Sequence, residues 1–248
     1  MPGDDHDAPD EQRQRAALLD AARRVNDLGI NQGKSGNLSV RLGGGFVITP
    51  SAVPYGGMEA RDLVRVQDDG TFTATEGRVP SSEWRLHRDL YRHRPEAGAV
   101  VHAHAMFATT LSCLGRDIPA FHYMIAVAGG NDIRCAPYAT FGTQALSDHA
   151  LRALAGRRAC LHGHHGMTVF AGTVADALAL AVEVETLAAM YWRALQVGVP
   201  RTLDDEEMRI VLQKFERYGK PPDGPSPPAR DGTEQDQSSS SGSAPEPG

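Results

Sequence analysis

The segment GAVVHAHA, residues 98–105, decides the fold of this chain. An aliphatic run that continues into alternating alanine and histidine is typical of a strand buried in a sheet. Successive side chains of a strand point to opposite faces, so His102 and His104 share one face and Ala103 lies on the other. Two imidazoles at the edge of a dry core either share a cation or are simply two polar residues on a strand. The pair alone leaves both interpretations open.

Helical and strand-like patterns alternate on both sides of this segment. Hydrophobic spacing and capping residues predict helices over residues 14–29, 80–91, 143–156, from 173 onward, and over 204–219. Strand-like runs occupy residues 37–42, 45–50, 63–67 and, as a pair, 158–172. The alternation predicts an α/β fold with a central, mostly antiparallel sheet flanked by helices, and a parallel sheet stays open as the alternative.

Composition supports one folded domain with two unfolded ends. The chain has 248 residues, of which 41% are hydrophobic and 23% are charged, as in ordinary globular proteins. We expect the domain to span residues 11–219. Residues 1–10 are acidic and contain proline, and residues 220–248 are crowded with Pro, Ser and Gly. Both segments are predicted to be disordered because they lack the apolar side chains that would offset the entropy cost of ordering.

Charge and cysteine content exclude several classes of protein. A net charge of −6 and a sequence pI near 5.9 argue against nucleic-acid binding, which needs a basic surface. No apolar run approaches the roughly 18 residues of a membrane span, and the start, MPGDDHDAPDEQ, lacks the basic and apolar parts of a signal peptide. We therefore expect a soluble, cytoplasmic protein that binds neither nucleic acid nor membrane. Its three widely spaced cysteines fit neither a disulfide framework nor a cysteine-based zinc site.

A second histidine cluster, CLHGHHG over residues 160–166, offers a third metal ligand. Catalytic zinc sites commonly take three protein ligands and keep one position for substrate. If the segment continues as a strand, His162 and His164 lie on one face and His165 on the other, so the three cannot all face one ion. His165 is then the candidate ligand, and His164 is expected to be structural.

The segment PSSEWRLH, residues 80–87, joins a phosphate-type motif to a carboxylate. Ser81 and Ser82 stand immediately before Glu83 at the start of the predicted helix, and hydroxyls with free amides at a helix N-terminus bind phosphate. Glu83, in the first turn, is stabilised there by the helix dipole alone, so in isolation it needs no functional explanation. Beside the histidines, the segment can hold a substrate phosphate and present a carboxylate to the reacting end of the substrate.

In this combination and order, the motifs resemble those of the class II aldolase/adducin family, most closely its zinc-dependent L-fuculose-1-phosphate aldolases. The resemblance covers nearly all of residues 11–219 and rests on NQGKSGNLSVR, ITPSAVPY, PSSEWRLH, VVHAHA, IPAFHYMIAVAGG, CAPYATFGTQAL, HHG and LQKFERYG. It implies a three-layer αβα sandwich. It also implies assembly as a C4 homotetramer with active sites at the subunit interfaces.

The resemblance implies a metal centre and a catalytic pair. One Zn²⁺ per subunit, or another divalent cation, would be bound by His102, His104 and His165. Glu83 would be a fourth ligand that becomes the general acid/base when substrate displaces it. Tyr123 would be a proton donor delivered from the neighbouring subunit.

The resemblance also implies a substrate pocket. Its phosphate would be held by small, hydroxylated or amide-bearing residues: Gly36, Asn37, Ser51, Ala52, Ser81 and Ser82. Phe141 and Tyr218 would close the site around the aldehyde. Ala52 stands where these aldolases usually have glycine, and Lys34 replaces a threonine that some of them carry.

The implied reaction is cleavage of a ketose 1-phosphate, such as L-fuculose 1-phosphate, to dihydroxyacetone phosphate and an aldehyde such as L-lactaldehyde. Cleavage of the carbon–carbon bond leaves an enediolate, which needs a cation or an iminium group to accept its charge. Zinc would supply the cation here, since no lysine occurs in the apolar context that suits a Schiff base. The protein would then be a lyase of carbohydrate metabolism that takes a phosphorylated ketose.

Three other functions stay open within the resemblance. A methylthioribulose-1-phosphate dehydratase would share the histidines and the glutamate, although FHYMIAVAGGNDIRCAPYATFGT matches the aldolases over a long stretch. A pentulose-phosphate epimerase would carry aspartate in place of Glu83. A non-catalytic, adducin-like scaffold would have lost metal ligands that this chain retains.

Overall fold

The computed structural model describes residues 7–73 and 77–217, and the described residues up to Glu216 belong to one compact unit. The first helix, α1, spans Asp7–Asp27 and so begins before the expected domain boundary at residue 11. Asp10, in this additional turn, pairs with Arg13 one helical turn further on, an arrangement that supports a helix end. The predicted disorder of residues 1–6 and 220–248 concerns segments outside the described residues.

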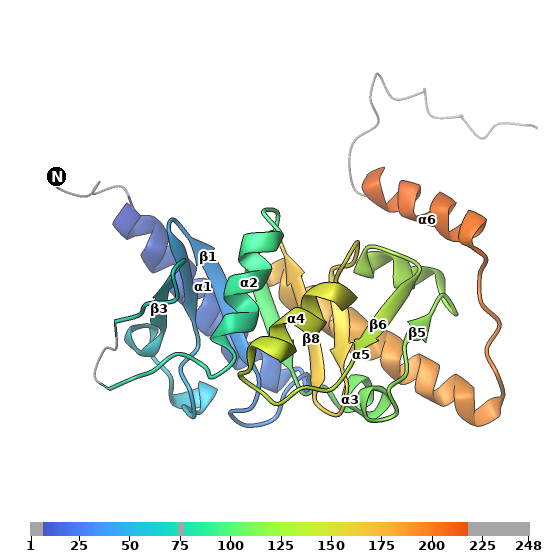
Figure 1. Ribbon diagram of the computed structural model, residues 1–248, viewed down its shortest axis with the longest axis horizontal. Coiled ribbons are helices and arrows are strands. Elements are labelled where there is room, and N and C mark those ends of the chain that lie inside the picture. The colour runs from blue at the N-terminus through green and yellow to red at the C-terminus, as the bar shows by residue number, and fades with distance from the viewer. Residues whose placement is uncertain (1–6, 74–76, 218–248) are drawn as a thin grey trace, which may run out of the picture. The chain divides into compact units, whose positions relative to one another are not determined.

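One sheet organises the described chain (Figure 1). Its strands run in the order β3-β2-β1-β4-β8-β7-β6-β5, and every neighbouring pair is antiparallel except β6 and β7, which are parallel. The expectation of a mostly antiparallel central sheet is thereby confirmed. The strands span Asn37–Leu42 (β1), Gly45–Ile48 (β2), Val64–Gln67 (β3), Ala99–Ala103 (β4), Ile118–Pro119 (β5), Asp132–Ala136 (β6), Ala159–His162 (β7) and Gly166–Ala171 (β8).

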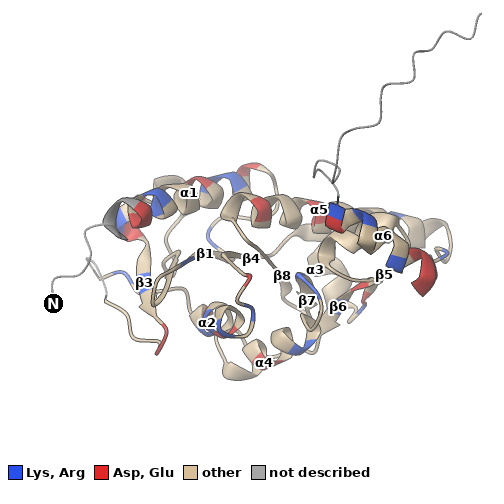
Figure 2. Cartoon of the chain, turned by 90° about the horizontal axis from the view of Figure 1, so that it is seen from above, with Lys and Arg blue, Asp and Glu red and all other residues tan. Residues whose placement is uncertain are grey.

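Helices cover both faces of the sheet, which gives the three-layer αβα arrangement that the resemblance implies. Figure 2 shows α1 and α5 on one side and α2 and α4 on the other, and α3 packs with α5. Besides α1, the α-helices are Trp84–His93 (α2), Met106–Cys113 (α3), Gln144–Ala153 (α4), Val174–Val197 (α5) and Asp205–Arg217 (α6). Three short 3₁₀ helices span Tyr55–Gly57 (η1), Ala60–Asp62 (η2) and Tyr123–Ala128 (η3).

The segment that opens the sequence argument forms the middle of the sheet. Strand β4 pairs with β1 on one side and β8 on the other, and all five of its residues are buried. Val101 and Ala103 join the large apolar core under α1, α3 and α5. Val100 faces the smaller core under α2 and α4, and His102 alternates in step with it. The alternation therefore places His102 on the α2 side of the sheet.

The start of α5 follows its predicted cap, whereas α2 starts later than predicted. The hydroxyl of Thr173 accepts a hydrogen bond from the backbone amide of Asp176, which opens α5 as the capping pattern predicts. Helix α2 begins at Trp84, four residues after its predicted start at residue 80, with Glu83 as the N-cap residue and no side-chain hydrogen bond at the cap. Within the described ranges, no helix combines the length and the hydropathy that crossing a membrane requires.

Candidate metal centre and substrate pocket

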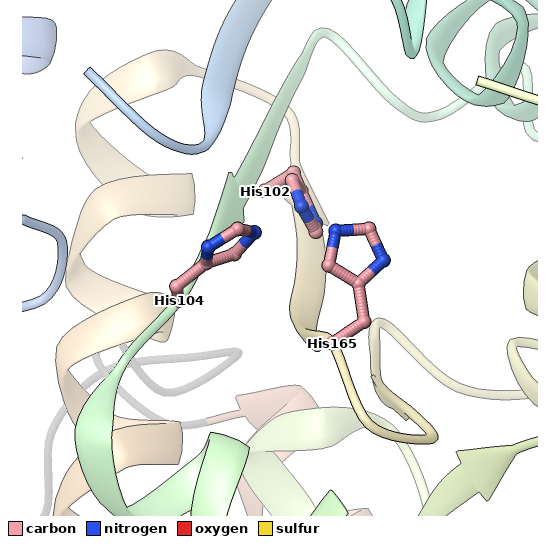
Figure 3. A group of neighbouring side chains, drawn as sticks. All are labelled: His102, His104 and His165. Carbon is pink, nitrogen blue, oxygen red and sulfur yellow. The ribbon is translucent and has the colours of Figure 1, made fainter. Parts of the chain in front are cut away.

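Three histidines converge at one end of β4. His102 is the fourth residue of the strand, His104 follows just after the strand ends, and His165 comes from the turn between β7 and β8. One ligand nitrogen from each ring lies within 4.8 Å of the others. The three rings turn toward a common point (Figure 3), and their centroids are 4.8 to 5.2 Å apart. The arrangement suits three ligands of one ion.

The way in which His165 reaches this point differs from the sequence argument. Strand β7 ends at His162, so residues 163–165 form the turn of a hairpin rather than a continuing strand. His164 adopts a left-handed conformation, with φ of 55°, and this reverses the chain. Gly166 then lies against β4 so closely that a Cβ on it would be 2.5 Å from the carbonyl oxygen of Ala103. The hairpin turn, and not strand alternation, aims His165 at the site.

The chain after His104 is fixed from the opposite layer. Both carboxylate oxygens of Glu185, in α5, accept hydrogen bonds from the backbone amides of Phe107 and Ala108, at 2.8 and 2.9 Å. These amides belong to the first turn of α3, where helix geometry leaves N–H groups without intrahelical partners. Because α3 begins two residues after His104, this contact holds the backbone from which His104 projects.

Glu83 completes the group of candidate ligands. It is the N-cap residue of α2 and is 5% exposed. Its Oε2 lies 3.2 Å from Nε2 of His102, and its Oε1 lies 3.5 Å from Nε2 of His165. Glu83 comes from the start of α2, and the histidines come from the ends of central strands of the sheet. The helix layer and the sheet therefore meet at this point.

The donor atoms of this group fit a divalent cation. Among the described residues, the buried atoms that find no hydrogen-bond partner include Glu83 Oε1, His102 Nε2 and His104 Nε2. Leaving such atoms unpaired costs about 1–3 kcal/mol each, and a shared cation removes that cost. The set of imidazole nitrogens and a carboxylate oxygen is typical of zinc and of similar divalent ions.

Burial keeps the histidines in the form that binds metal. Desolvation lowers the pKa of His102 well below its usual value, and the neighbouring His165 and His104 lower it further. Desolvation, followed by His165, also lowers the pKa of His104. Both imidazoles are therefore neutral near neutral pH, as metal ligation requires.

A buried pair that sequence reasoning did not assign lies behind His102. The hydroxyl of Thr168 is 3.2 Å from Nδ1 of His102 and 2.7 Å from Nε2 of His162. All three side chains are fully buried. His162 therefore supports a candidate ligand from behind instead of facing the ion. Its place depends on the register of β8 with β4 and β7, which the sequence alone does not provide.

A pocket of about 340 Å³ opens beside the histidines. All six residues expected to hold phosphate line it, together with Glu83, His104, His165 and the expected closing residue Phe141. The lining also includes residues given no site role above or expected to be structural: Ser35, Pro50, Tyr138, Ala139 and His164, with Lys34 supplying a cation. Tyr138 lies within the CAPYATFG motif and could have been suspected from it.

Two backbone positions give the pocket its shape. Gly36 has φ of 73°, and a Cβ there would lie 2.7 Å from the carbonyl oxygen of His102, so only glycine fits between β1 and the metal centre. Ala52 has φ of 62°, the left-handed conformation that glycine adopts freely and alanine does not. Alanine thus occupies a turn that keeps the conformation suited to glycine.

Among the expected substrate-contacting residues that the structure describes, Tyr123 does not line this pocket. Tyr123 begins η3, is 51% exposed and lies outside the pocket lining of its own chain. Its ring stacks on that of Phe215 with centroids 6.4 Å apart. Tyr218 lies outside the described residues.

The fold and the site together define a candidate metal centre at the C-terminal end of the central strand β4 of a three-layer αβα fold, with a polar pocket beside it. The sequence model described as "Class II Aldolase and Adducin N-terminal domain" matches residues 16–192. The chain therefore belongs to the class II aldolase and adducin family.

Named relatives match more than four fifths of the chain. A 5-methylthioribulose-1-phosphate/5-deoxyribulose-1-phosphate aldolase of Rhodospirillum rubrum is 54% identical over 215 residues, which are 87% of this chain and 96% of the relative. An L-fuculose phosphate aldolase of Escherichia coli K12 is 48% identical over 203 residues, covering 82% and 94%. A solved L-fuculose 1-phosphate aldolase superposes with a TM-score of 0.79 at 38% identity, covering 82% and 96%. These relatives are aldolases that act on phosphorylated sugars.

Proposed function

We propose that the protein is a metal-dependent aldolase that cleaves a ketose 1-phosphate to dihydroxyacetone phosphate and an aldehyde. The observation that carries this proposal is the position of His102, His104, His165 and Glu83 beside a pocket lined by small polar residues and Lys34. One end of the pocket suits a phosphate, and the other combines a cation site with a carboxylate. A retro-aldol cleavage needs both.

The phosphate end is supplied by the chain itself. The hydroxyls of Ser81 and Ser82 and the amides beside Gly36 offer donors, and the ammonium of Lys34 adds a positive charge at this end of the pocket. Anchoring the phosphate fixes the position of the first three carbons of the substrate. The bond to be broken, between C3 and C4, then lies within reach of the reacting groups.

The reacting end moves one proton from the C4 hydroxyl to C3. Breaking the C3–C4 bond turns the C4 hydroxyl into the aldehyde carbonyl and leaves its electron pair as an enediolate on C2 and C3. A bound divalent cation supplies the positive charge that stabilises this anion. Glu83 delivers a proton to C3, which completes dihydroxyacetone phosphate. The proton that leaves the C4 hydroxyl is taken up by the ionised oxygen of a tyrosine, for which we propose Tyr123. This returns the tyrosine to the neutral form that is a proton donor in the reverse reaction, and solvent resupplies the proton to Glu83 before the next turnover.

This role for Tyr123 requires a second copy of the chain. Its exposed ring lies outside the pocket of its own subunit, so it can act only on a neighbouring one. We accordingly propose a homotetramer with fourfold symmetry, in which Tyr123 of each subunit faces the metal centre of the next. Sedimentation analysis should give a tetramer of the 26.6 kDa chain. A monomer with full turnover would contradict this part of the proposal.

For the substrate, we propose a 5-deoxypentulose 1-phosphate or its 5-methylthio derivative. The support is the 54% identity to the Rhodospirillum rubrum aldolase, against 48% to the fuculose phosphate aldolase of Escherichia coli. Cleavage would release acetaldehyde or methylthioacetaldehyde beside dihydroxyacetone phosphate. L-Fuculose 1-phosphate, which would release L-lactaldehyde, is the second candidate.

A coupled assay for dihydroxyacetone phosphate tests both proposals. The zinc-loaded protein is given 5-methylthioribulose 1-phosphate, 5-deoxyribulose 1-phosphate, L-fuculose 1-phosphate and L-ribulose 5-phosphate, each with and without a chelator. We expect chelator-sensitive release of dihydroxyacetone phosphate from the first two at the highest kcat/KM. Loss of water from the methylthio substrate without carbon–carbon cleavage would identify a dehydratase, and interconversion of pentulose phosphates would identify an epimerase. Either result would overturn the aldolase proposal.

A further inference from the structure

A chain of buried polar side chains runs from Glu83 away from the pocket into the protein. Nδ2 of Asn37 lies 2.8 Å from Oε2 of Glu83, and Oδ1 of Asn37 lies 2.5 Å from Nε2 of His87. Nδ1 of His87 lies 2.6 Å from the hydroxyl of Ser39, which lies 2.8 Å from the hydroxyl of Tyr91. None of the five side chains belongs to a residue more than 5% exposed.

The direction of every hydrogen bond in this row of side chains follows from the carboxylate at its end. A carboxylate has no proton to give, so Asn37 must present its NH₂ group to Glu83 and its carbonyl oxygen to His87. His87 must then carry its proton on Nε2 and accept at Nδ1. The hydroxyl of Ser39 therefore donates a hydrogen bond to Nδ1. The oxygen of the same hydroxyl accepts a hydrogen bond from the hydroxyl of Tyr91. Four donors thus point in one direction, toward the carboxylate.

The geometry of α2 and β1 produces this alignment. Glu83, His87 and Tyr91 are four residues apart along α2, so they form one stripe on the helix. Asn37 and Ser39 are two residues apart on β1, so they share the face that meets this stripe. Apolar core side chains such as Phe46 and Val100 surround these groups between α2 and the sheet, and a run of polar groups costs free energy there unless each is paired.

We propose that His87, with Asn37, Ser39 and Tyr91, is a positioning device for Glu83. This row of hydrogen bonds holds the Glu83 carboxylate in one orientation toward the histidines. It also stabilises the anionic form of the carboxylate, because aligned hydrogen bonds polarise one another in a buried setting. Burial lowers the pKa of His87 to about 4, so the imidazole stays neutral and can both donate and accept. The role in turnover rests on the proposed function, whereas the order of donors does not.

The main test replaces His87 with phenylalanine, which keeps a ring beside Phe46 and removes both nitrogens. Asn37 loses its donor, and Glu83 loses its fixed orientation. We expect zinc affinity, measured by chelator competition, and kcat each to fall about 10- to 100-fold, with KM changing less than about threefold. Ser39→Ala, a small change, should lower both by about three- to tenfold, because His87 loses the donor at Nδ1.

Leu90→Ala is the matched control. Leu90 is fully buried in the same helix and takes no part in the chain. This variant should lower the unfolding temperature while zinc affinity and kcat stay within about twofold of wild type. If folded His87→Phe and Ser39→Ala behave like Leu90→Ala, the positioning role is wrong.

A spectroscopic measurement separates this inference from the proposed function. In ¹⁵N NMR spectra, assigned by comparison with His87→Phe, His87 should be protonated on Nε2 and bare on Nδ1. The opposite tautomer would overturn the chain of donors whatever the protein catalyses. If the expected tautomer and the loss of zinc affinity appear but the wild type cleaves no ketose 1-phosphate, the proposed function fails and the positioning of Glu83 stands.

Discussion

Alternate residues of β1 and β4 face two different environments. Leu38 and Val101 point to the layer of α1, α3 and α5, where they join the large apolar core. Asn37 and His102, which are paired in the β1–β4 register, point to the layer of α2 and carry the candidate chemistry. A shift of the register by one residue would exchange these faces. The apolar face therefore fixes the register on which the site depends.

The comparison suggests that the layer of α1, α3 and α5 mainly stabilises the fold, whereas the layer of α2 mainly holds the candidate site. Burial on the α1 side removes a large apolar area from water and holds the strands in place. On the α2 side, the stabilising free energy of apolar burial is smaller, because polar groups are buried there and each of them needs another as its hydrogen-bond partner. Substitutions on the first face should change stability more than chemistry, and substitutions on the second should do the reverse.

The largest effect is expected at Glu83. Glu83→Gln keeps the shape and an acceptor for Asn37 but removes the charge and the proton that C3 requires. We expect kcat to fall by about 10²- to 10⁴-fold, the contribution of a general acid/base. Inorganic phosphate should still compete with substrate, and the unfolding temperature should stay close to that of wild type. Steady-state kinetics and calorimetry measure both, and a near-normal kcat would reject the assigned role.

A substitution in the large core under α1, α3 and α5 should lower stability and leave kcat unchanged. Leu18, in α1, is fully buried in the large core. Leu18→Ala should lower the free energy of unfolding by about 2–5 kcal/mol, through lost burial and the cavity left behind. At a temperature where the variant is folded, kcat per folded molecule should match wild type. A selective loss of kcat would show that the two layers are coupled.

Acid should destabilise the α2 layer. The pKa of His87 is lowered by burial to about 4, whereas an unfolded histidine titrates near 6.5. Between these values the unfolded state binds the additional proton, so stability is highest above pH 6.5 and falls as the pH drops toward 4. His87 alone should account for about 3 kcal/mol of this loss. Urea unfolding of metal-free protein should show the decline, and a decline of equal size in His87→Phe would contradict the assignment.

Much of the fold could be predicted from the sequence because local signals agreed with it. The alternation around His102 marks a buried strand, and Thr173 marks the start of α5 at the observed residue. The mostly antiparallel sheet follows from short strands that lie close in sequence. The hydrophobic spacing predicts the first helix from residue 14, later than the observed start at Asp7, because no cap marks that start and the first turn of α1 resembles an acidic, proline-containing tail.

The site was less accessible to sequence reasoning where it depends on register and turns. The glycine and histidine pattern of CLHGHHG does not reveal where β7 ends, so the sequence alone leaves open whether residues 163–165 continue the strand or form the observed hairpin turn. The contact between Ser39 and His87 joins residues 48 positions apart. Each looks like an ordinary helix or strand residue by itself. Only the packing of α2 on β1 shows that they belong to one chain of hydrogen bonds.

The smallest change in stability is expected for a substitution of Ala52. Ala52 holds φ of 62°, which costs an alanine roughly 1 kcal/mol relative to glycine. Ala52→Gly relieves this strain but gives the unfolded chain more freedom, so the net stabilisation should be below about 1 kcal/mol. KM should change little because the backbone keeps its course. Thermal unfolding measures the difference, and a loss of stability would mean that the alanine methyl contributes packing that outweighs the strain.

The most direct test of the account is a zinc titration of metal-free protein followed by release of dihydroxyacetone phosphate. His165→Asn and His164→Asn form a matched pair in one turn, and asparagine tolerates the left-handed conformation of His164. We predict that activity of the wild type and of His164→Asn returns with zinc and saturates at about one ion per chain. His165→Asn should bind zinc at least tenfold more weakly. Full turnover of metal-free wild type, or unchanged zinc binding by His165→Asn, would contradict a metal centre formed by His102, His104 and His165.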